Sequence, residues 1–349
     1  MTALRVSARP EPDASLRPVP WRRMAWVTWR QHRFALAGVA ALLGALAVYL
    51  WLAALQMHHA WAAAAACRPA SSDACGNLIG DFLATYWPTA QIIATLLLAV
   101  PALIGAFVGA PVLARELETG TFRFAWTQGF GRWRWTLAKL VPLAVTVAAA
   151  AGAFSVLFSW YFQPFFAAGQ QIPLAPAVFG LRGVAFAAWT LAAFAIGALA
   201  GMLIRRVVPA IAATLAAYTG LALAAGLYLR QHYMTPLLTS NPNLAGSPWI
   251  ISQGQWIISQ WWTKGGKPVS QSALSQVLQQ EAPQLAGKGG VPQSPSVTQY
   301  LNQHGYTLWT TYQPGSRFWP FQWIEGGWLL ALSVLLIAAA VWLVRRRAA

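Results

Sequence analysis

The stretch ARELETGTFRFAWTQGFGRWRWTLAK, residues 114–139, separates two long apolar runs and decides how the chain is organised. It holds Glu116 and Glu118, two of only eight acidic residues in the protein, together with five basic residues. Phe122 and Trp126 are four positions apart and would share one apolar face of a short helix. The pattern indicates either an amphipathic element that lies on a membrane surface or in a partner's groove, or a polar loop with interfacial tryptophans.

Composition places the chain among membrane proteins. Of its 349 residues 57% are hydrophobic and only 9% are charged, whereas soluble domains carry about a quarter charged residues. A net charge of +16 is typical of nucleic-acid binding when the basic residues form one continuous patch. Here the basic residues flank apolar runs instead, so we expect membrane lipids and no nucleic acid as partners.

Six uncharged runs are long enough to span a bilayer, which requires about 20 residues for a hydrocarbon core of ~30 Å. They cover residues 34–57, 89–112, 140–161, 184–204 and 207–229, and the run between Glu325 and Arg345. Pro101 predicts a kink in the second run. The sequence therefore predicts an all-α polytopic membrane protein with six transmembrane helices.

The segments around these spans complete the predicted organisation. Residues 1–20 are rich in proline and polar residues and predict a disordered cytoplasmic tail. Residues 21–33 mix tryptophan with arginine and predict an interfacial helix ahead of the first span. Spans one to five occupy residues 34–229 and enclose the cytoplasmic loop 114–139, and residues 326–349 form the sixth span with a basic cytoplasmic tail.

Residues 230–325 predict a small extracytoplasmic domain of α+β structure, with a partly disordered loop as the alternative. Helical spacing, Ser-Pro start signals, a glycine stop signal and alternating patterns locate its elements. Helices are predicted at 270–280 and from Ser294 to Gly305, and strands at 249–255, 256–262 and 306–312. The two strands before residue 263 are a near repeat, which also suits a segment lying on the membrane.

The distribution of basic residues predicts the orientation. Seventeen of the 24 Lys and Arg residues fall on the side of the N-terminus, and seven fall on the other side. Because cytoplasmic loops carry the excess of Lys and Arg, both termini and the loop 114–139 are expected in the cytoplasm. We therefore expect a multi-pass protein of the cell (plasma) membrane.

The only two cysteines, Cys67 and Cys75, lie eight positions apart in the first loop of the predicted outer side. An oxidising exterior favours a disulfide between them, and two free thiols are the alternative. Their spacing and the lack of nearby histidines do not suit a zinc site.

Several kinds of chemistry have no signature in the sequence. There is no phosphate-binding Gly-x-x-x-x-Gly-Lys-Ser/Thr motif and no His-Glu-x-x-His motif, so we expect no catalytic, cofactor or metal site in this chain. The predicted spans hold essentially no ionisable residue, which disfavours an ion-coupled transporter and a membrane enzyme. The composition favours a transport path through the membrane whose energy is supplied from outside this chain.

Two Gly-x-x-x-Gly pairs stand in the second and fourth predicted spans: Gly105 with Gly109, and Gly197 with Gly201. Such pairs let helices approach closely. Glycine is also common in transmembrane helices generally, so both interpretations remain open.

Three motifs resemble those of ABC-2-type transporter permeases, in particular actinobacterial members. The first is ELETGTFRFAWTQ at 116–128, followed by Gly-x-x-Arg-Trp and Leu-x-Lys-Leu. The others are WVTWRQHR at 26–33 and YQPGSRFWPFQWIE at 312–325. Together with the layout of spans the resemblance covers most of the chain, and it is weakest over 235–310.

The resemblance implies that the loop after the second span carries a coupling helix that docks on a separate ATPase subunit. On that basis the expected contact residues are Glu116, Glu118, Gly120, Thr121, Phe122, Arg123 and Trp126. It also implies a homo- or heterodimer of permeases with two ATPase subunits, which bind the ATP and magnesium, and export more often than uptake.

A rival interpretation is a polytopic sensor or assembly protein whose outer domain binds a ligand and whose loop docks a cytoplasmic effector. A neighbouring gene for an ATP-binding cassette protein would favour the permease. The sequence does not reveal the substrate.

Overall fold

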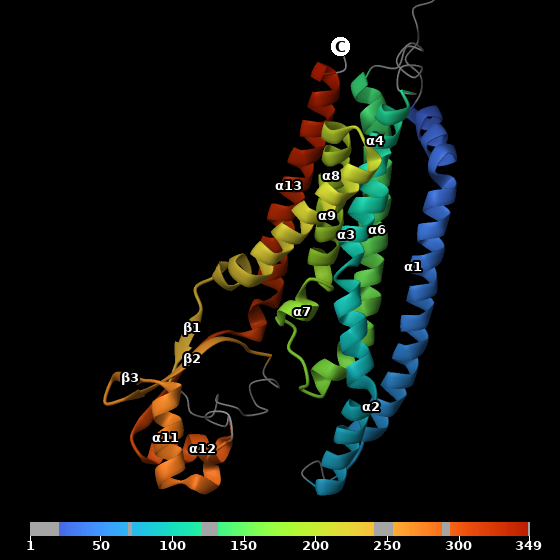
Figure 1. Cartoon of the computed structure of the whole chain (residues 1–349). Helices are drawn as coiled ribbons and strands as arrows, with labels where there is room; N and C mark the ends of the chain where they lie inside the picture. The colour runs from blue at the N-terminus through green and yellow to red at the C-terminus, as the bar shows by residue number, and fades with distance from the viewer. Residues whose placement is uncertain (1–20, 69–71, 121–131, 241–253, 288–293, 348–349) are drawn as a thin grey trace, which may run out of the picture.

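The computed structural model describes residues 21–68, 72–120, 132–240, 254–287 and 294–347. Within these residues six helices are long and apolar enough to cross a membrane, and they run side by side as a bundle (Figure 1). They cover Leu43–Ala65, Asp73–Thr119, Trp133–Ala167, Gly183–Ile204, Val207–His232 and Gly315–Arg346. The predicted all-α fold with six transmembrane helices is confirmed.

The first helix, α1, runs without interruption from Trp21 to Ala65. It therefore joins residues 21–33, predicted as a separate interfacial helix, to the first span in one element. That residues 21–33 lie at a membrane surface stays a prediction, and the predicted tail 1–20 lies outside the described residues. The buried side chains of α1 include Leu50, Ala54 and Met57, toward its C-terminal end.

The second span consists of four consecutive helical segments. These are α2 (Asp73–Leu97), α3 (Val100–Ile104), the π-helical η1 (Gly105–Gly109) and α4 (Ala110–Thr119). The break between α2 and α3 comes just before Pro101, which has no N–H group to donate within a helix. The interruption therefore falls where the sequence predicts a distortion.

The remaining four spans include the central helix of the bundle. They are α6 (Arg132–Ala167), α8 (Gly183–Ile204), α9 (Val207–Ala224, continued by η2, Ala225–Leu229, and η3, Arg230–His232) and α13 (Phe318–Arg347), with the short α7 (Pro176–Phe179) before α8. The central helix is α8, which packs against α4, α6, α9 and α13 and buries most of its residues. Its apolar character on all sides suits this position.

Aromatic side chains fill the part of the core between α2 and α6. Ring centroids lie 5.2 Å apart for Phe158 and Phe162, 5.1 Å for Phe162 and Phe165, and 5.8 Å for Phe165 and Phe82. Such tilted and stacked pairs add to the free energy gained from burying apolar area.

A small domain at one end of the bundle, which we call the sheet domain (residues 233–317), contains an antiparallel sheet in the order β1-β4-β2-β3. The strands are β1 (Leu237–Thr239), β2 (Trp256–Lys264), β3 (Lys267–Val269) and β4 (Tyr306–Gln313). The helices α11 (Gln271–Glu281) and α12 (Pro295–Gln303) lie beside the sheet (Figure 1). Their Leu274 and Leu301 share an apolar core with Trp262 and Leu308 of the strands.

The described part of this domain has the predicted α+β structure. Ser270 and Ser294 cap the two helices by accepting hydrogen bonds from Ala273 N–H and Val297 N–H, at 3.2 and 3.3 Å. The strands expected at 256–262 and 306–312 are present, whereas the one expected at 249–255 lies almost entirely outside the described residues. We call the end of the bundle that carries the sheet domain the domain end, and the opposite end, where α4 and α6 meet residues 120–131, the loop end (Figure 1).

Candidate functional site

Glu116 of α4 joins the second span to the third at the loop end. Its carboxylate forms an ion pair with Lys139 near the start of α6. Lys139 is only 4% exposed, and its Nζ lies 4.4 Å from the centroid of the Trp135 ring. Because a buried ammonium group is costly without a partner, this pair fixes α4 against α6.

Glu118 joins the second span to the fifth. Its Oε2 accepts a hydrogen bond of 3.0 Å from the backbone N–H of Val207, the first residue of α9. A carboxylate at a helix N-terminus satisfies a free N–H group and interacts favourably with the helix dipole. Arg205, in the left-handed region at φ 59°, ends α8 and makes the turn that brings Val207 to this position.

Gly120 ends α4 in the left-handed region, at φ 71°, a conformation that favours glycine. A Cβ atom there would meet nothing within 4 Å, so the backbone conformation and not crowding requires glycine. The other expected contact residues, Thr121, Phe122, Arg123 and Trp126, lie outside the described residues. At the loop end α4 is thus anchored on spans three and five.

The two Gly-x-x-x-Gly pairs lie against each other where the second span crosses α8. A Cβ atom on Gly105 would come within 2.5 Å of the Ala193 carbonyl oxygen, and one on Gly109 within 2.6 Å of the Phe194 carbonyl oxygen. A Cβ atom on Gly197 would overlap the carbonyl oxygen of Gly105. Both pairs therefore serve close backbone packing between the second and fourth spans, and are not merely glycines of the kind common in transmembrane helices.

A buried ion pair stands at the domain end, between Arg230 at the end of span five and Glu325 of α13. Arg230 Nη2 lies 2.7 Å from Glu325 Oε1, and Nε lies 2.9 Å from Oε2, so the pair is bidentate. Neither side chain is accessible to more than a few per cent. The guanidinium carbon also lies 4.5 Å from the centroid of the Phe179 ring.

Two further donors complete the coordination of Glu325. The indole Nε1 of Trp189 in α8 donates to Oε1 at 2.7 Å, and the Tyr233 hydroxyl donates to Oε2 at 3.0 Å. Trp328 Nε1 in turn donates to the Tyr233 hydroxyl at 3.0 Å. The carboxylate thus joins the fourth, fifth and sixth spans, and four donor atoms compensate for its loss of water.

Hydrogen bonds attach the sheet domain to this network. The side-chain amide of Gln313 donates from Nε2 to the Gln231 carbonyl oxygen at the end of span five, at 3.4 Å, and to the Met234 carbonyl oxygen at 2.8 Å. The buried Gln322 accepts a hydrogen bond from Ala185 N–H at the start of α8, at 2.8 Å. The domain end therefore holds the Glu325 network together with hydrogen bonds of Gln313 and Gln322 to spans four and five.

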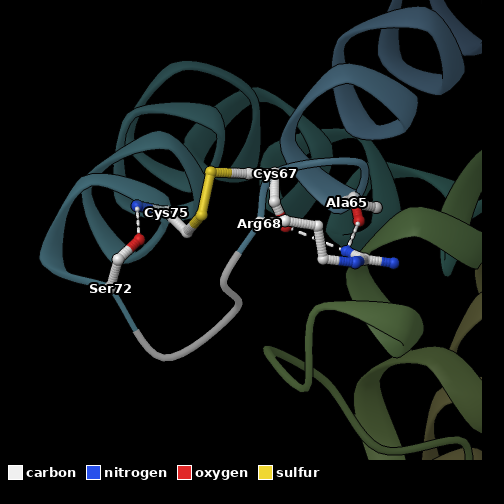
Figure 2. Close-up of a disulfide and its surroundings, with 5 residues drawn as sticks. All are labelled: Ala65, Cys67, Arg68, Ser72 and Cys75. Carbon is white, nitrogen blue, oxygen red and sulfur yellow. Dashed lines mark hydrogen bonds between the residues drawn. A yellow bond between two sulfur atoms is a disulfide. The ribbon is translucent and has the colours of Figure 1, made fainter.

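Cys67 and Cys75 are joined by a disulfide, with Cα atoms 5.6 Å apart (Figure 2). It links the end of α1 to the first turn of α2. Ser72 beside it caps α2 through a hydrogen bond from Cys75 N–H, and Arg68 Nη1 donates to the Ala65 and Cys67 carbonyl oxygens at 2.9 Å each.

A protein-family model described as ABC-2 membrane transporter related matches residues 40–230, more than half of the chain. The chain belongs to this family. It is thus an ABC-2-type permease, a multi-pass membrane protein of a transport system. No curated protein and no solved structure matches the chain.

The match begins within α1 and ends at Arg230, so it contains the first five spans of the permease. Glu116, Glu118, Lys139 and both glycine pairs fall inside it. The sheet domain and α13, with Glu325, fall outside it.

Sequence reasoning missed the buried ion pair of the permease, because it took Arg230 and Glu325 as the two ends of the outer domain. The helices extend beyond the apolar runs, so Lys139, Arg230 and Glu325 lie on the same helices, just outside the runs that were predicted to span. The available signal was the opposite charge of two residues at the facing ends of spans five and six.

Polar groups elsewhere in the described spans have local partners. The hydroxyls of Thr95, Ser159 and Thr214 each donate to a carbonyl oxygen four residues earlier in the same helix, at 2.7–2.8 Å. Among the described residues no group of three or more His, Cys, Asp or Glu side chains could hold a metal ion.

Proposed function

We propose that this permease is the membrane-spanning subunit of an exporter that is powered by ATP hydrolysis on a separate ATPase subunit, which docks on the loop 114–139. Membership in the ABC-2 family supports a permease. The ATP and the magnesium ion would bind to the ATPase subunit, and this chain would have no catalytic role.

The observation that carries the proposal is the anchoring of α4, from which the loop begins, on two other spans. Glu116 is held by Lys139 and Glu118 by the N-terminus of α9, so a force applied to residues 120–131 reaches spans two, three and five together. A loop that only connected two spans would not require its few acidic residues to be bonded to two other helices.

This arrangement refines the roles expected from the sequence. Both carboxylates have partners inside the permease, which suits anchors that transmit movement. Phe122 and Trp126, with Thr121 and Arg123 beside them, are the residues that we assign to contact with the ATPase, because an apolar helical face can fill a partner's groove.

The remaining parts of the proposal concern assembly and orientation. Two permeases, identical or different, would associate with two ATPase subunits in the cell membrane. The positive-inside rule supports a loop end and both termini in the cytoplasm, and a sheet domain outside the cell. The conditions outside the cell would then also suit the disulfide between Cys67 and Cys75.

Co-purification of the permease with a co-expressed ATP-binding cassette ATPase from the same genome tests the docking. We expect the double variant Phe122→Ala, Trp126→Ala to insert at normal abundance but to recover much less ATPase, because the apolar contact face is lost. Glu281→Lys is the matched control, since Glu281 is exposed in the sheet domain, where its carboxylate accepts a hydrogen bond of 3.3 Å from the Tyr300 hydroxyl. If the double variant recovers as much ATPase as the control, the loop is not the docking element.

A further inference from the structure

A cavity of about 560 Å³ lies between α1, the second span and α6. Residues 37–47 line it on α1, residues 100–108 on α3 and η1, and residues 146–157 on α6, with Phe186 of α8 at its inner side. Its volume falls within the range of pockets that hold small molecules, roughly 300–1,000 Å³.

The walls of the cavity offer nothing to a polar ligand. Apart from Thr146, every lining residue is aliphatic, aromatic or glycine. The Thr146 hydroxyl already donates to the Pro142 carbonyl oxygen of its own helix, at 2.9 Å. Water would find no set of polar partners here, and apolar cavities of this kind bind apolar molecules. The lining therefore suits a hydrocarbon.

The cavity exists because small side chains stand on α1 and α6 along this part. Gly44 and Ala47 on α1 face Ala150 and Ala153 on α6, and these small side chains leave the space between the helices unfilled. Among the described side chains of α1, the first that is buried is Leu50. Side chains around an empty cavity lose their dispersion contacts on one side, so filling it stabilises the bundle.

The length of the cavity matches the depth of one leaflet of the bilayer. Residues 37–47 extend along α1 for about 15 Å at a rise of 1.5 Å per residue. This is about half of a ~30 Å hydrocarbon core, which is the depth of one leaflet. A volume of about 560 Å³ over that length gives a cross-section of roughly 40 Å², about half that of a helix ~10 Å wide, so the space is too narrow for another helix but admits a flexible hydrocarbon chain.

We propose that this cavity binds one acyl chain of a membrane phospholipid, which enters from the leaflet at the loop end and completes the packing of α1 against α3 and α6. The chain lies lengthwise between the helices, and the headgroup stays at the membrane surface. The site does not depend on the proposed coupling to an ATPase.

Photolabelling of the full-length protein tests the site. The protein is reconstituted in phosphatidylcholine vesicles that contain a phospholipid with a diazirine in the middle of one acyl chain, irradiated, and digested for mass spectrometry. We expect residues 146–157 to carry several-fold more label than Val334 and Leu335, which are about two-thirds exposed on α13. Equal labelling at both places would overturn the proposal.

Variants that fill the cavity sharpen the test. Ala47→Phe combined with Ala150→Phe should remove most of the label from residues 146–157, whereas Val334→Phe, the matched control on the lipid-facing surface, should leave it unchanged. If the filled variant does not insert, the labelling pattern of the wild-type protein still tests whether an acyl chain occupies the cavity. Efficient disulfide formation between two copies that carry Ala40→Cys would show a second copy in the cavity and would also overturn the proposal.

Discussion

Single residues determine the stability of the packing at the domain end of the bundle. Glu325 is fully buried, and its two oxygens accept hydrogen bonds from Arg230, Trp189 and Tyr233. A charge in such a position is tolerated only because every partner is present. The stability of spans four to six therefore depends on this one carboxylate more than on any exposed charge.

Replacing Glu325 by alanine tests this dependence. Glu325→Ala leaves the guanidinium of Arg230 buried without a counter-ion, and we expect a loss of about 3–5 kcal/mol of stability. Thermal unfolding of the purified protein in detergent measures it. The double variant Arg230→Met, Glu325→Leu should recover much of the loss, because it removes both charges. If Glu325→Ala unfolds at the wild-type temperature, the pair carries no stability.

Gly197 is the second residue on which the packing depends. Gly197→Ala would place a Cβ atom on the Gly105 carbonyl oxygen and force the second span away from α8, at a cost of about 1–3 kcal/mol or more. The matched control is Gly220→Ala in α9, where a Cβ atom meets nothing within 4 Å. The control should be neutral or slightly stabilising, since alanine favours a helix by about 0.5–1 kcal/mol over glycine. Equal thermal stability of the two variants would contradict the close contact.

At the scale of elements, the sequence predicted the helices and helix breaks that are determined by residues close together in the chain. The apolar runs located six spans, and Pro101 located the break in the second. In the sheet domain, helical spacing located α11 and Ser294 marked the start of α12. These signals lie within a few positions of the structure that they determine.

The partners of the charged residues could not be predicted in the same way. Glu118 and Val207 are 89 positions apart, and Arg230 and Glu325 are 95 positions apart. Such contacts follow from how the spans pack, and a single sequence holds no local pattern that pairs them. For the same reason the sequence indicated the glycine pairs as candidates for packing but not that they pack against each other.

The disulfide acts on the connection between α1 and α2. We expect Cys67 and Cys75 to resist alkylation until a reductant is added, and the double variant Cys67→Ser, Cys75→Ser to lose about 2–3 kcal/mol, as the chain-entropy estimate gives for so short a loop. Mass spectrometry after alkylation under non-reducing conditions measures the first effect. Two alkylated thiols in the unreduced protein would contradict the pairing.

At the scale of the whole molecule, the orientation of the bundle determines which end meets the ATPase. In a background without Cys67 and Cys75, single cysteines at Ser15 and at Ser272, an exposed position of α11, report the two sides. We expect Ser272→Cys to react with an impermeant thiol reagent in intact cells and Ser15→Cys to react only after lysis, because 17 of the 24 basic residues favour the side of the N-terminus. The opposite pattern would place the loop end outside the cell.

The central claim is that the anchored loop 114–139 transmits the work of an ATPase to the spans. Transport-linked ATP hydrolysis by the complex in proteoliposomes tests it most directly, with Glu116→Lys compared against the swapped pair Glu116→Lys, Lys139→Glu. We expect the single variant to bind the ATPase but to lose most of the stimulated hydrolysis, because like charges then separate α4 from α6, and the swapped pair to recover a large part of it. A single variant that hydrolyses ATP at the wild-type rate would show that the anchor does not couple the two subunits.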